Sequence, residues 1–181
     1  MRRFSTKFTS NFCWDFDVET AKTTTKGDAS FTWDDVVIGA SEKSSVYRVT
    51  EDEIIAFASR YDPLPIHVDL EIAAAGPFGS LTASGVHMLA IRMRLVHDFA
   101  YGGGVIASIG LDEVRYLAPL RAGQACQVEI KFLEKRPSAK HADRGIVIIE
   151  MVMRADGVPV ASMKDIVLMR RRKVAASGGS A

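Results

Sequence analysis

One segment of the chain, residues 82–99, most constrains what it can fold into. Placed on a helix of about 3.6 residues per turn, its apolar side chains lie on almost every side. These side chains are Val86, Met88, Leu89, Ala90, Ile91, Met93, Leu95 and Val96. A helix that is apolar all round is buried rather than laid on a surface. The rest of the chain must therefore wrap this helix.

Four segments that follow the helix have the pattern of β-strands and supply the wrapping. They span residues 105–120, 124–135, 145–154 and 158–170. In the second of them, apolar residues from Cys126 to Phe132 alternate with polar ones, which is typical of a strand with one buried and one wet face. Asp156-Gly157 predicts a tight hairpin turn between the last two. With an earlier strand within residues 36–49, the pattern predicts an α+β domain, an antiparallel sheet wrapped round a long central helix.

The chain has a one-domain length of 181 residues, enough to bury a substantial core. Residues 1–30 show little periodicity and read as an N-terminal arm, and residues 31–173 form the predicted domain. Residues 174–181 are small and polar, which is typical of a flexible tail. Long antiparallel strands leave an exposed sheet edge, so we expect the domain to form a homodimer.

The charges of the chain are nearly balanced, with 23 Lys and Arg residues against 22 Asp and Glu. No large net field therefore draws it onto nucleic acid or an anionic membrane, and the basic run at residues 170–173 reads as a solubilising end. The most apolar stretches are too short to span a bilayer. No apolar core follows the basic residues at the amino terminus, as a secretory signal would require. We expect a cytoplasmic protein.

The two cysteines, Cys13 and Cys126, lie far apart in the sequence. Neither belongs to a C-x-x-C motif or has the Cys/His spacing of a zinc site. The sequence therefore predicts two reduced thiols, no disulfide and no metal site.

Two short helices are expected before the central one. Thr50 and Glu53 have the spacing of a capping box, which predicts a short helix that starts after Thr50 and carries Ile54, Ile55, Phe57 and Ala58. Asp69 has the position of a cap for a second helix over residues 70–75, which Gly76-Pro77 ends.

Two prolines, Pro63 and Pro65, predict a stiff loop over residues 61–67 between these helices. Asp62 and His67 lie in this loop, five residues apart. A carboxylate and an imidazole that are held together can share a water, one accepting its proton and the other holding its oxygen. In the alternative interpretation, Asp62 caps the turn and His67 packs in the core. The spacing alone leaves both open.

The entry to the central helix, residues 78–85, is a second candidate site. The first turn of a helix presents unpaired N–H groups at the positive end of its dipole, and Gly85 lets a ligand approach them closely. Such a turn can bind an oxyanion. Gly85 is equally compatible with close packing against the sheet. His87, on the same helix, has the pattern of a core histidine rather than a ligand.

Several of these motifs occur together in one known family. The chain resembles the MaoC-like dehydratases, whose best-known members are the (R)-specific enoyl-CoA hydratases, from about Thr32 to Arg172. The matching motifs are D-x-x-P-I-H-x-D at 62–69, A-A-x-x-x-F-G at 73–79, A-S-G at 83–85, the strand and turn signature at 110–123 and E-K-R-P-S at 134–138.

The resemblance implies a hot-dog fold and a hydratase or dehydratase activity. By similarity, Asp62 and His67 orient and activate water, and the Gly85 amide donates to the thioester carbonyl. Water then adds to a trans-2-enoyl thioester, giving a 3-hydroxyacyl thioester. No metal or separate cofactor is implied, since coenzyme A is part of the substrate.

Four further residues are expected at the substrate. Ser84 stands where many relatives have His, directly before the predicted oxyanion donor. Arg121, Arg136 and Lys140 are candidates to grip the phosphates of coenzyme A. A solvated loop is the alternative for the basic residues.

One departure from the family pattern keeps other functions open. Leu64 stands where many relatives have Asn, so a polar side chain is lost beside the predicted catalytic pair. The alternatives are an acyl-CoA thioesterase on the same fold and a non-catalytic acyl-CoA-binding subunit. Thioesterases of this fold typically carry a lone carboxylate on or near the central helix, whereas here the Asp/His pair precedes it.

Overall fold

The computed structural model describes residues 28–172. The predicted tail and all but the last residues of the predicted arm lie outside this range. The elements of the first half are the 3₁₀ helix η1 (Trp33–Asp35), strands β1 (Ser41–Lys43) and β2 (Tyr47–Arg48), and helices α1 (Glu51–Tyr61), α2 (Pro65–Val68), α3 (Leu70–Ala75) and α4 (Gly85–Val96). Those of the second half are the 3₁₀ helix η2 (Ala100–Gly104) and strands β3 (Val105–Tyr116), β4 (Ala125–Pro137), β5 (Arg144–Ala155) and β6 (Val158–Arg170).

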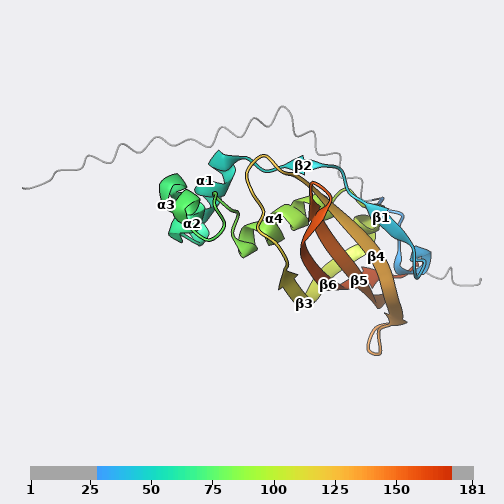
Figure 1. Cartoon of the computed structure of the whole chain (residues 1–181). Helices are drawn as coiled ribbons and strands as arrows, with labels where there is room; N and C mark the ends of the chain where they lie inside the picture. The colour runs from blue at the N-terminus through green and yellow to red at the C-terminus, as the bar shows by residue number, and fades with distance from the viewer. Residues whose placement is uncertain (1–27, 173–181) are drawn as a thin grey trace, which may run out of the picture.

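The strands form one antiparallel sheet in the order β1-β4-β5-β6-β3, and β2 also pairs with β4. Figure 1 shows this sheet curled round α4, with α1, α2 and α3 gathered beyond one end. The arrangement confirms the predicted α+β class and the antiparallel sheet wrapped round a central helix.

The core lies between α4 and the inner face of the sheet. Met88, Ile91 and Leu95 of α4 are buried, and strands β4 and β5 turn alternate side chains toward them. These are Cys126, Val128, Ile130, Phe132, Val147, Ile149, Met151 and Met153. Burial raises the pKa of the Cys126 thiol to about 11, so it stays protonated at neutral pH. Cys13, the other predicted thiol, lies outside the described residues.

The central helix is shorter than the predicted span of residues 82–99. Thr82 forms an isolated antiparallel bridge with Arg121, and the Ala83 amide donates to the Leu120 carbonyl at 2.8 Å. These two residues therefore extend along another segment, and the helix starts only after Ser84. Its apolar pattern continues past both ends because Ala83 and Phe99 are buried as well, and burial alone does not define a helix boundary.

Local signals elsewhere gave mixed results. Asp69 caps α3 by accepting from the Ile72 amide at 2.9 Å, and Asp156 and Gly157 both have positive φ in the β5–β6 turn, as predicted. The predicted strand within residues 36–49 is instead the two short strands β1 and β2. The predicted loop of residues 61–67 contains α2, because a proline without an N–H group fits the first turn of a helix.

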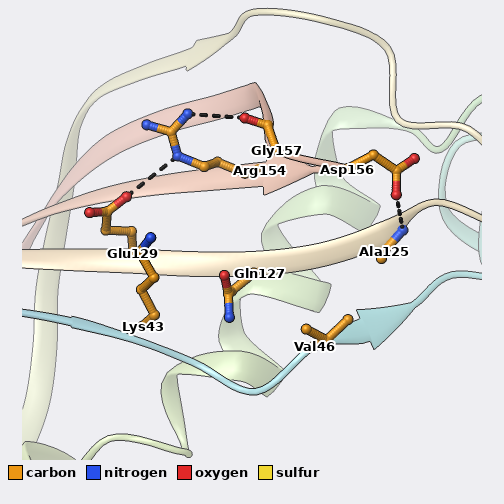
Figure 2. A pocket seen from close by; sticks show the side chains of 8 residues that line it. All are labelled: Lys43, Val46, Ala125, Gln127, Glu129, Arg154, Asp156 and Gly157. Carbon is orange, nitrogen blue, oxygen red and sulfur yellow. Dashed lines mark hydrogen bonds and ion pairs between the residues drawn. The ribbon is translucent and has the colours of Figure 1, made fainter.

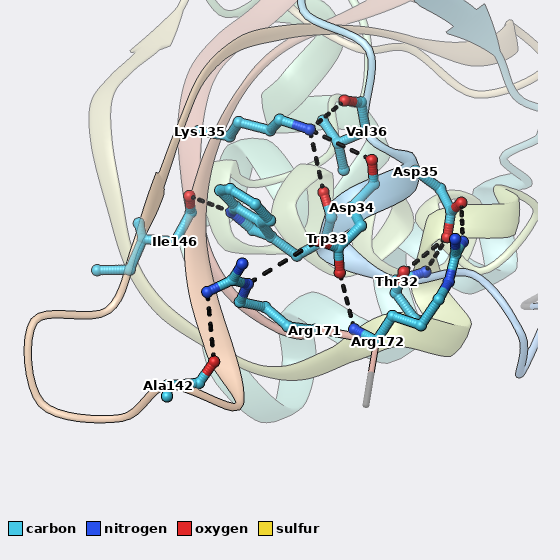
Figure 3. A network of polar contacts seen from close by, with 10 residues as sticks. All are labelled: Thr32, Trp33, Asp34, Asp35, Val36, Lys135, Ala142, Ile146, Arg171 and Arg172. Carbon is cyan, nitrogen blue, oxygen red and sulfur yellow. Dashed lines mark hydrogen bonds and ion pairs between the residues drawn. The ribbon is translucent and has the colours of Figure 1, made fainter. Parts of the chain in front are cut away.

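A cluster around Trp33, here called the Trp33 clasp, fastens η1 to the ends of the sheet (Figure 3). Lys135 and Arg171 lie over the indole ring at 4.6 and 5.0 Å from its centroid, and Arg172 forms an ion pair with Asp35 at 2.5 Å. Arg171 and Arg172 therefore make contacts between the end of β6 and η1. This corrects their interpretation as part of a solubilising end.

Candidate active site

Asp62 and His67 come together at the junction of α1 and α2. Asp62 follows the last residue of α1, where its amide donates to the Ala58 carbonyl at 2.9 Å. His67 lies in α2, one turn after the prolines, and is buried. The His67 Nε2 atom is 4.0 Å from the Asp62 Oδ2 atom. The loop thus brings an imidazole and a carboxylate close to each other, as the interpretation that they share a water requires.

The other ring nitrogen of His67 fixes its tautomer. Nδ1 lies 2.6 Å from the Thr82 carbonyl oxygen, and a carbonyl oxygen can only accept a hydrogen bond. Nδ1 therefore carries the proton, and in the neutral ring Nε2 presents a lone pair on the Asp62 side. The same hydrogen bond ties His67 to the segment that leads into α4.

The N-terminus of α4 lies three residues beyond this contact. The Ser84 side chain caps the helix by accepting from the His87 amide at 3.2 Å, and Ser84 is only 1% exposed. Its hydroxyl is thus buried and serves as the cap, while the substrate contact expected of Ser84 stays a prediction. Gly85 is the first residue of the helix, at the positive end of the dipole.

Tyr116, at the end of β3, covers one side of Gly85. A Cβ atom added to Gly85 would lie 2.6 Å from Cζ of Tyr116 and 2.9 Å from its hydroxyl oxygen. The glycine therefore permits a close approach by the sheet, which fits the packing interpretation of this residue, and its oxyanion role stays a prediction. The motif at residues 110–123 included Tyr116, but its contact with Gly85 joins residues far apart in the sequence and was missed.

The three basic residues expected to bind phosphate lie in different places. Arg121 is beside the entry to α4, where its guanidinium donates to the Ser80 hydroxyl at 3.0 Å and to the Phe78 carbonyl at 3.2 Å. Arg136 lies near the far end of β4, and Lys140 in the β4–β5 loop. Figure 1 shows this loop projecting at the opposite end of the sheet from α1, α2 and α3. A single chain does not bring Arg136 and Lys140 to the Asp62–His67 pair.

A half-buried polar network that the sequence did not reveal joins three elements next to this site. Glu53 of α1 accepts from the Tyr47 hydroxyl at 2.7 Å and lies 3.0 Å from His87 Nε2. The Phe57 ring stacks on His87 with centroids 4.3 Å apart. Burial disfavours the Glu53 carboxylate, but the hydrogen bonds from His87 and Tyr47 outweigh it and hold the pKa of Glu53 below its usual value. The network locks α1, which leads to Asp62, against α4, which begins at Gly85.

This lowered pKa makes the network a source of pH-dependent stability. A carboxyl with a depressed folded-state pKa stabilises the fold above its ordinary pKa, here 4.5, and loses that contribution as the pH falls through the folded value. We expect Glu53→Gln to lower the free energy of unfolding at pH 7, and the difference from wild type to shrink toward pH 3, as measured by urea titration at each pH.

Glu51→Gln is the matched control, because Glu51 is exposed on the first turn of the same helix. It should follow the wild-type pH profile. A Glu53→Gln difference that stays constant from pH 7 to pH 3 would show that the carboxylate charge contributes no stability.

A separate cavity of about 480 Å³ lies on the outer face of the sheet (Figure 2). Three of the four charged side chains that line it, all except Lys43, are already engaged with the protein. Arg154 contacts Glu129 and the Gly157 carbonyl, and Asp156 accepts from the Ala125 amide. It faces away from α4, since Gln127 and Glu129 alternate with the buried residues of β4.

Two further properties concern only the described part of the chain. Residues 28–172 contain no group of three or more His, Cys, Asp or Glu side chains arranged to bind a metal ion. No helix in this range is long and apolar enough to cross a bilayer.

The amino-acid sequence is similar to a known protein family and to several known proteins. A family model described as MaoC like domain matches residues 36–150. The 3-hydroxyacyl-thioester dehydratase Z of Mycobacterium tuberculosis is 41% identical over 95 residues, which cover 49% of this chain and 63% of that protein. The protein YdeM of Bacillus subtilis is 31% identical over 117 residues, covering 64% of this chain and 82% of that protein.

Solved structures show the same fold. The MaoC-like dehydratase from Rhodospirillum rubrum superposes with a TM-score of 0.74 and 33% identity, covering 80% of this chain and 99% of that one. The (R)-hydratase from A. caviae superposes with a TM-score of 0.61 and 18% identity, covering 74% and 96%. The hot-dog fold expected from the sequence is confirmed.

Proposed function

Since this chain belongs to the MaoC-like domain family, we propose that it adds water reversibly to a trans-2-enoyl thioester of coenzyme A, giving a 3-hydroxyacyl thioester. The observation that carries the proposal is the pairing of Asp62 with His67, whose ring is fixed by the Thr82 carbonyl. The dehydratase relative supports the reaction class.

The pair has the geometry to hold one water by both of its hydrogens. Asp62 Oδ2 and His67 Nε2 are both acceptors and lie 4.0 Å apart. If a water oxygen lies about 2.8 Å from each acceptor, the angle between the two acceptors at that oxygen is about 90°. This is close to the angle between the two O–H bonds of water. Its oxygen lone pairs then remain free to attack the β-carbon of the enoyl group.

The protons of the reaction balance through Asp62. Asp62 takes one proton as the water oxygen bonds to the β-carbon, and negative charge develops on the thioester oxygen against the Gly85 amide. Asp62, now an acid, can return a proton to the α-carbon, which restores the carboxylate. Water addition is not an oxidation or reduction, so the proposed reaction uses no redox cofactor, and the Gly85 amide takes the polarising role that a metal would otherwise have.

The proposed active form is a homodimer joined along β3. This strand is at the edge of the sheet, and it carries exposed apolar side chains at Ile106 and Ile109, as α4 does at Val86 and Met93. An unpaired, apolar sheet edge is a template for a second strand, and a symmetric dimer covers it. Light scattering should give the mass of two chains, and the mass of one chain would contradict this assembly.

Two assays on the purified full chain test the proposed function. With a short trans-2-enoyl-CoA, we expect loss of the absorbance of the conjugated thioester without release of thiol. With a saturated acyl-CoA, we expect no reaction. Release of free thiol would instead identify a thioesterase, and acyl-CoA binding without turnover would identify a binding subunit.

A further inference from the structure

Tyr116 is positioned at the proposed site by the end of β3. Tyr116 pairs with Ala161 of β6 in the sheet. The amide of the next residue, Leu117, donates to the Val160 carbonyl at 2.8 Å. The backbone on which the phenol stands is therefore held by the sheet. The side chain itself is half exposed, at 49% for the residue, so it can meet a ligand that reaches the N-terminus of α4.

The phenol lies against the residue that carries the proposed oxyanion donor. A methyl group on Gly85 would lie 2.9 Å from the Tyr116 hydroxyl oxygen. The Cβ position of the first helical residue points toward the helix N-terminus, which is the side where an oxyanion binds to the free N–H groups. Within residues 28–172 the Tyr116 hydroxyl makes no hydrogen bond, so its proton is available to a ligand.

We propose that the Tyr116 hydroxyl is a second oxyanion donor, which joins the Gly85 amide in binding the thioester oxygen as it becomes negative. This assignment rests on the proposed hydration. The hydroxyl keeps its proton throughout and contributes a hydrogen bond only. The ring beside it forms an apolar wall at the site. Tyr116 is then a catalytic residue, because it touches the reacting thioester.

Tyr116→Phe tests the hydroxyl, since it keeps the ring and removes only the donor. A donor that acts mainly in the transition state changes kcat with little change in KM. Loss of a hydrogen bond to a charged group costs about 1.5–3 kcal/mol, so kcat should fall about tenfold to a hundredfold. Tyr101→Phe is the control, because Tyr101 lies in η2, which follows the C-terminal end of α4, at the other end of this helix from Gly85. It should keep the wild-type kcat.

A double-mutant cycle with Gly85→Ala tests whether the two donors act at one place. The added methyl must displace the phenol, which it can do because the phenol is the end of a flexible side chain. Gly85→Ala therefore removes the Tyr116 donor as well. Adding Tyr116→Phe to Gly85→Ala should lower kcat less than about twofold further, a strongly non-additive result.

The outcomes separate this inference from the proposed function. If wild type hydrates the enoyl thioester and Tyr116→Phe matches it in kcat, the second donor is wrong while the hydratase stands. If the effects of Tyr116→Phe and Gly85→Ala on kcat multiply in the double variant, the two substitutions act independently. The hydroxyl then acts away from Gly85, and the assignment is overturned. If wild type itself does not hydrate the substrate, both the function and the donor fail.

Discussion

Asp62→Asn is expected to lower the rate of hydration by about a hundred- to ten-thousandfold while the fold stays intact. Asparagine has nearly the same size as aspartate but cannot take the proton of water at neutral pH. A positioned general base contributes about a hundred- to ten-thousandfold in rate, so kcat should fall within that range. The Asp62 carboxylate makes no hydrogen bond with the described residues and its side chain is one-third exposed, so the melting temperature should match that of wild type.

His67 calls for two substitutions, because its two nitrogens have different roles. His67→Ala removes both and leaves the Thr82 carbonyl without its donor. His67→Asn places an amide N–H near the former Nδ1 position and removes the Nε2 acceptor. Both variants should lose hydration, and His67→Asn should recover stability that His67→Ala loses. Substantial turnover in Asp62→Asn and in both His67 variants would contradict the assignment of this pair.

Arg92→Met is expected to give the largest loss of stability. Arg92 of α4 and Asp165 of β6 are 1% and 3% exposed and form an ion pair at 3.1 Å. The Ser108 hydroxyl donates to the other Asp165 oxygen at 2.6 Å. Removing one partner of a buried pair leaves an uncompensated charge and costs about 3–5 kcal/mol. The free energy of unfolding in urea measures this loss.

Two further variants make this prediction specific. Arg94→Met breaks a partly exposed pair with Asp98, which lies at 3.9 Å just past the end of α4, and should cost only about 0–1 kcal/mol. Replacing both partners, as Arg92→Met with Asp165→Leu, should restore much of the loss because neither charge is then buried alone. Equal losses in Arg92→Met and Arg94→Met would contradict the account of the buried pair.

Features set by neighbouring residues were predicted well from the sequence. The Asp69 cap and the Asp156-Gly157 turn each depend on a hydrogen bond or a backbone conformation within a few residues. The pattern of apolar residues identified the buried helix and the strands around it. The start of the helix was placed wrongly because Thr82 is held by a contact with Arg121, which no local pattern records.

The contact between the two candidate catalytic side chains could be predicted because both residues lie in one loop. Asp62 and His67 are five residues apart, and the two prolines between them predicted a stiff loop that holds their side chains close together. The contact of Glu53 with His87 spans 34 residues, and Tyr116 reaches Gly85 from another element. Such contacts depend on how α1, α4 and β3 pack together, so the sequence named His87 only as a core residue and gave Tyr116 no role.

The source of the new oxygen atom in the product tests the central claim most directly. The full chain is incubated with a trans-2-enoyl-CoA in oxygen-labelled water, and the products are analysed by mass spectrometry. We predict label in the 3-hydroxyl group of an intact thioester, and almost none in the Asp62→Asn variant. Label in a free carboxylate, or an unlabelled and unchanged thioester, would contradict the assignment of Asp62 and His67 as the pair that adds water to the double bond.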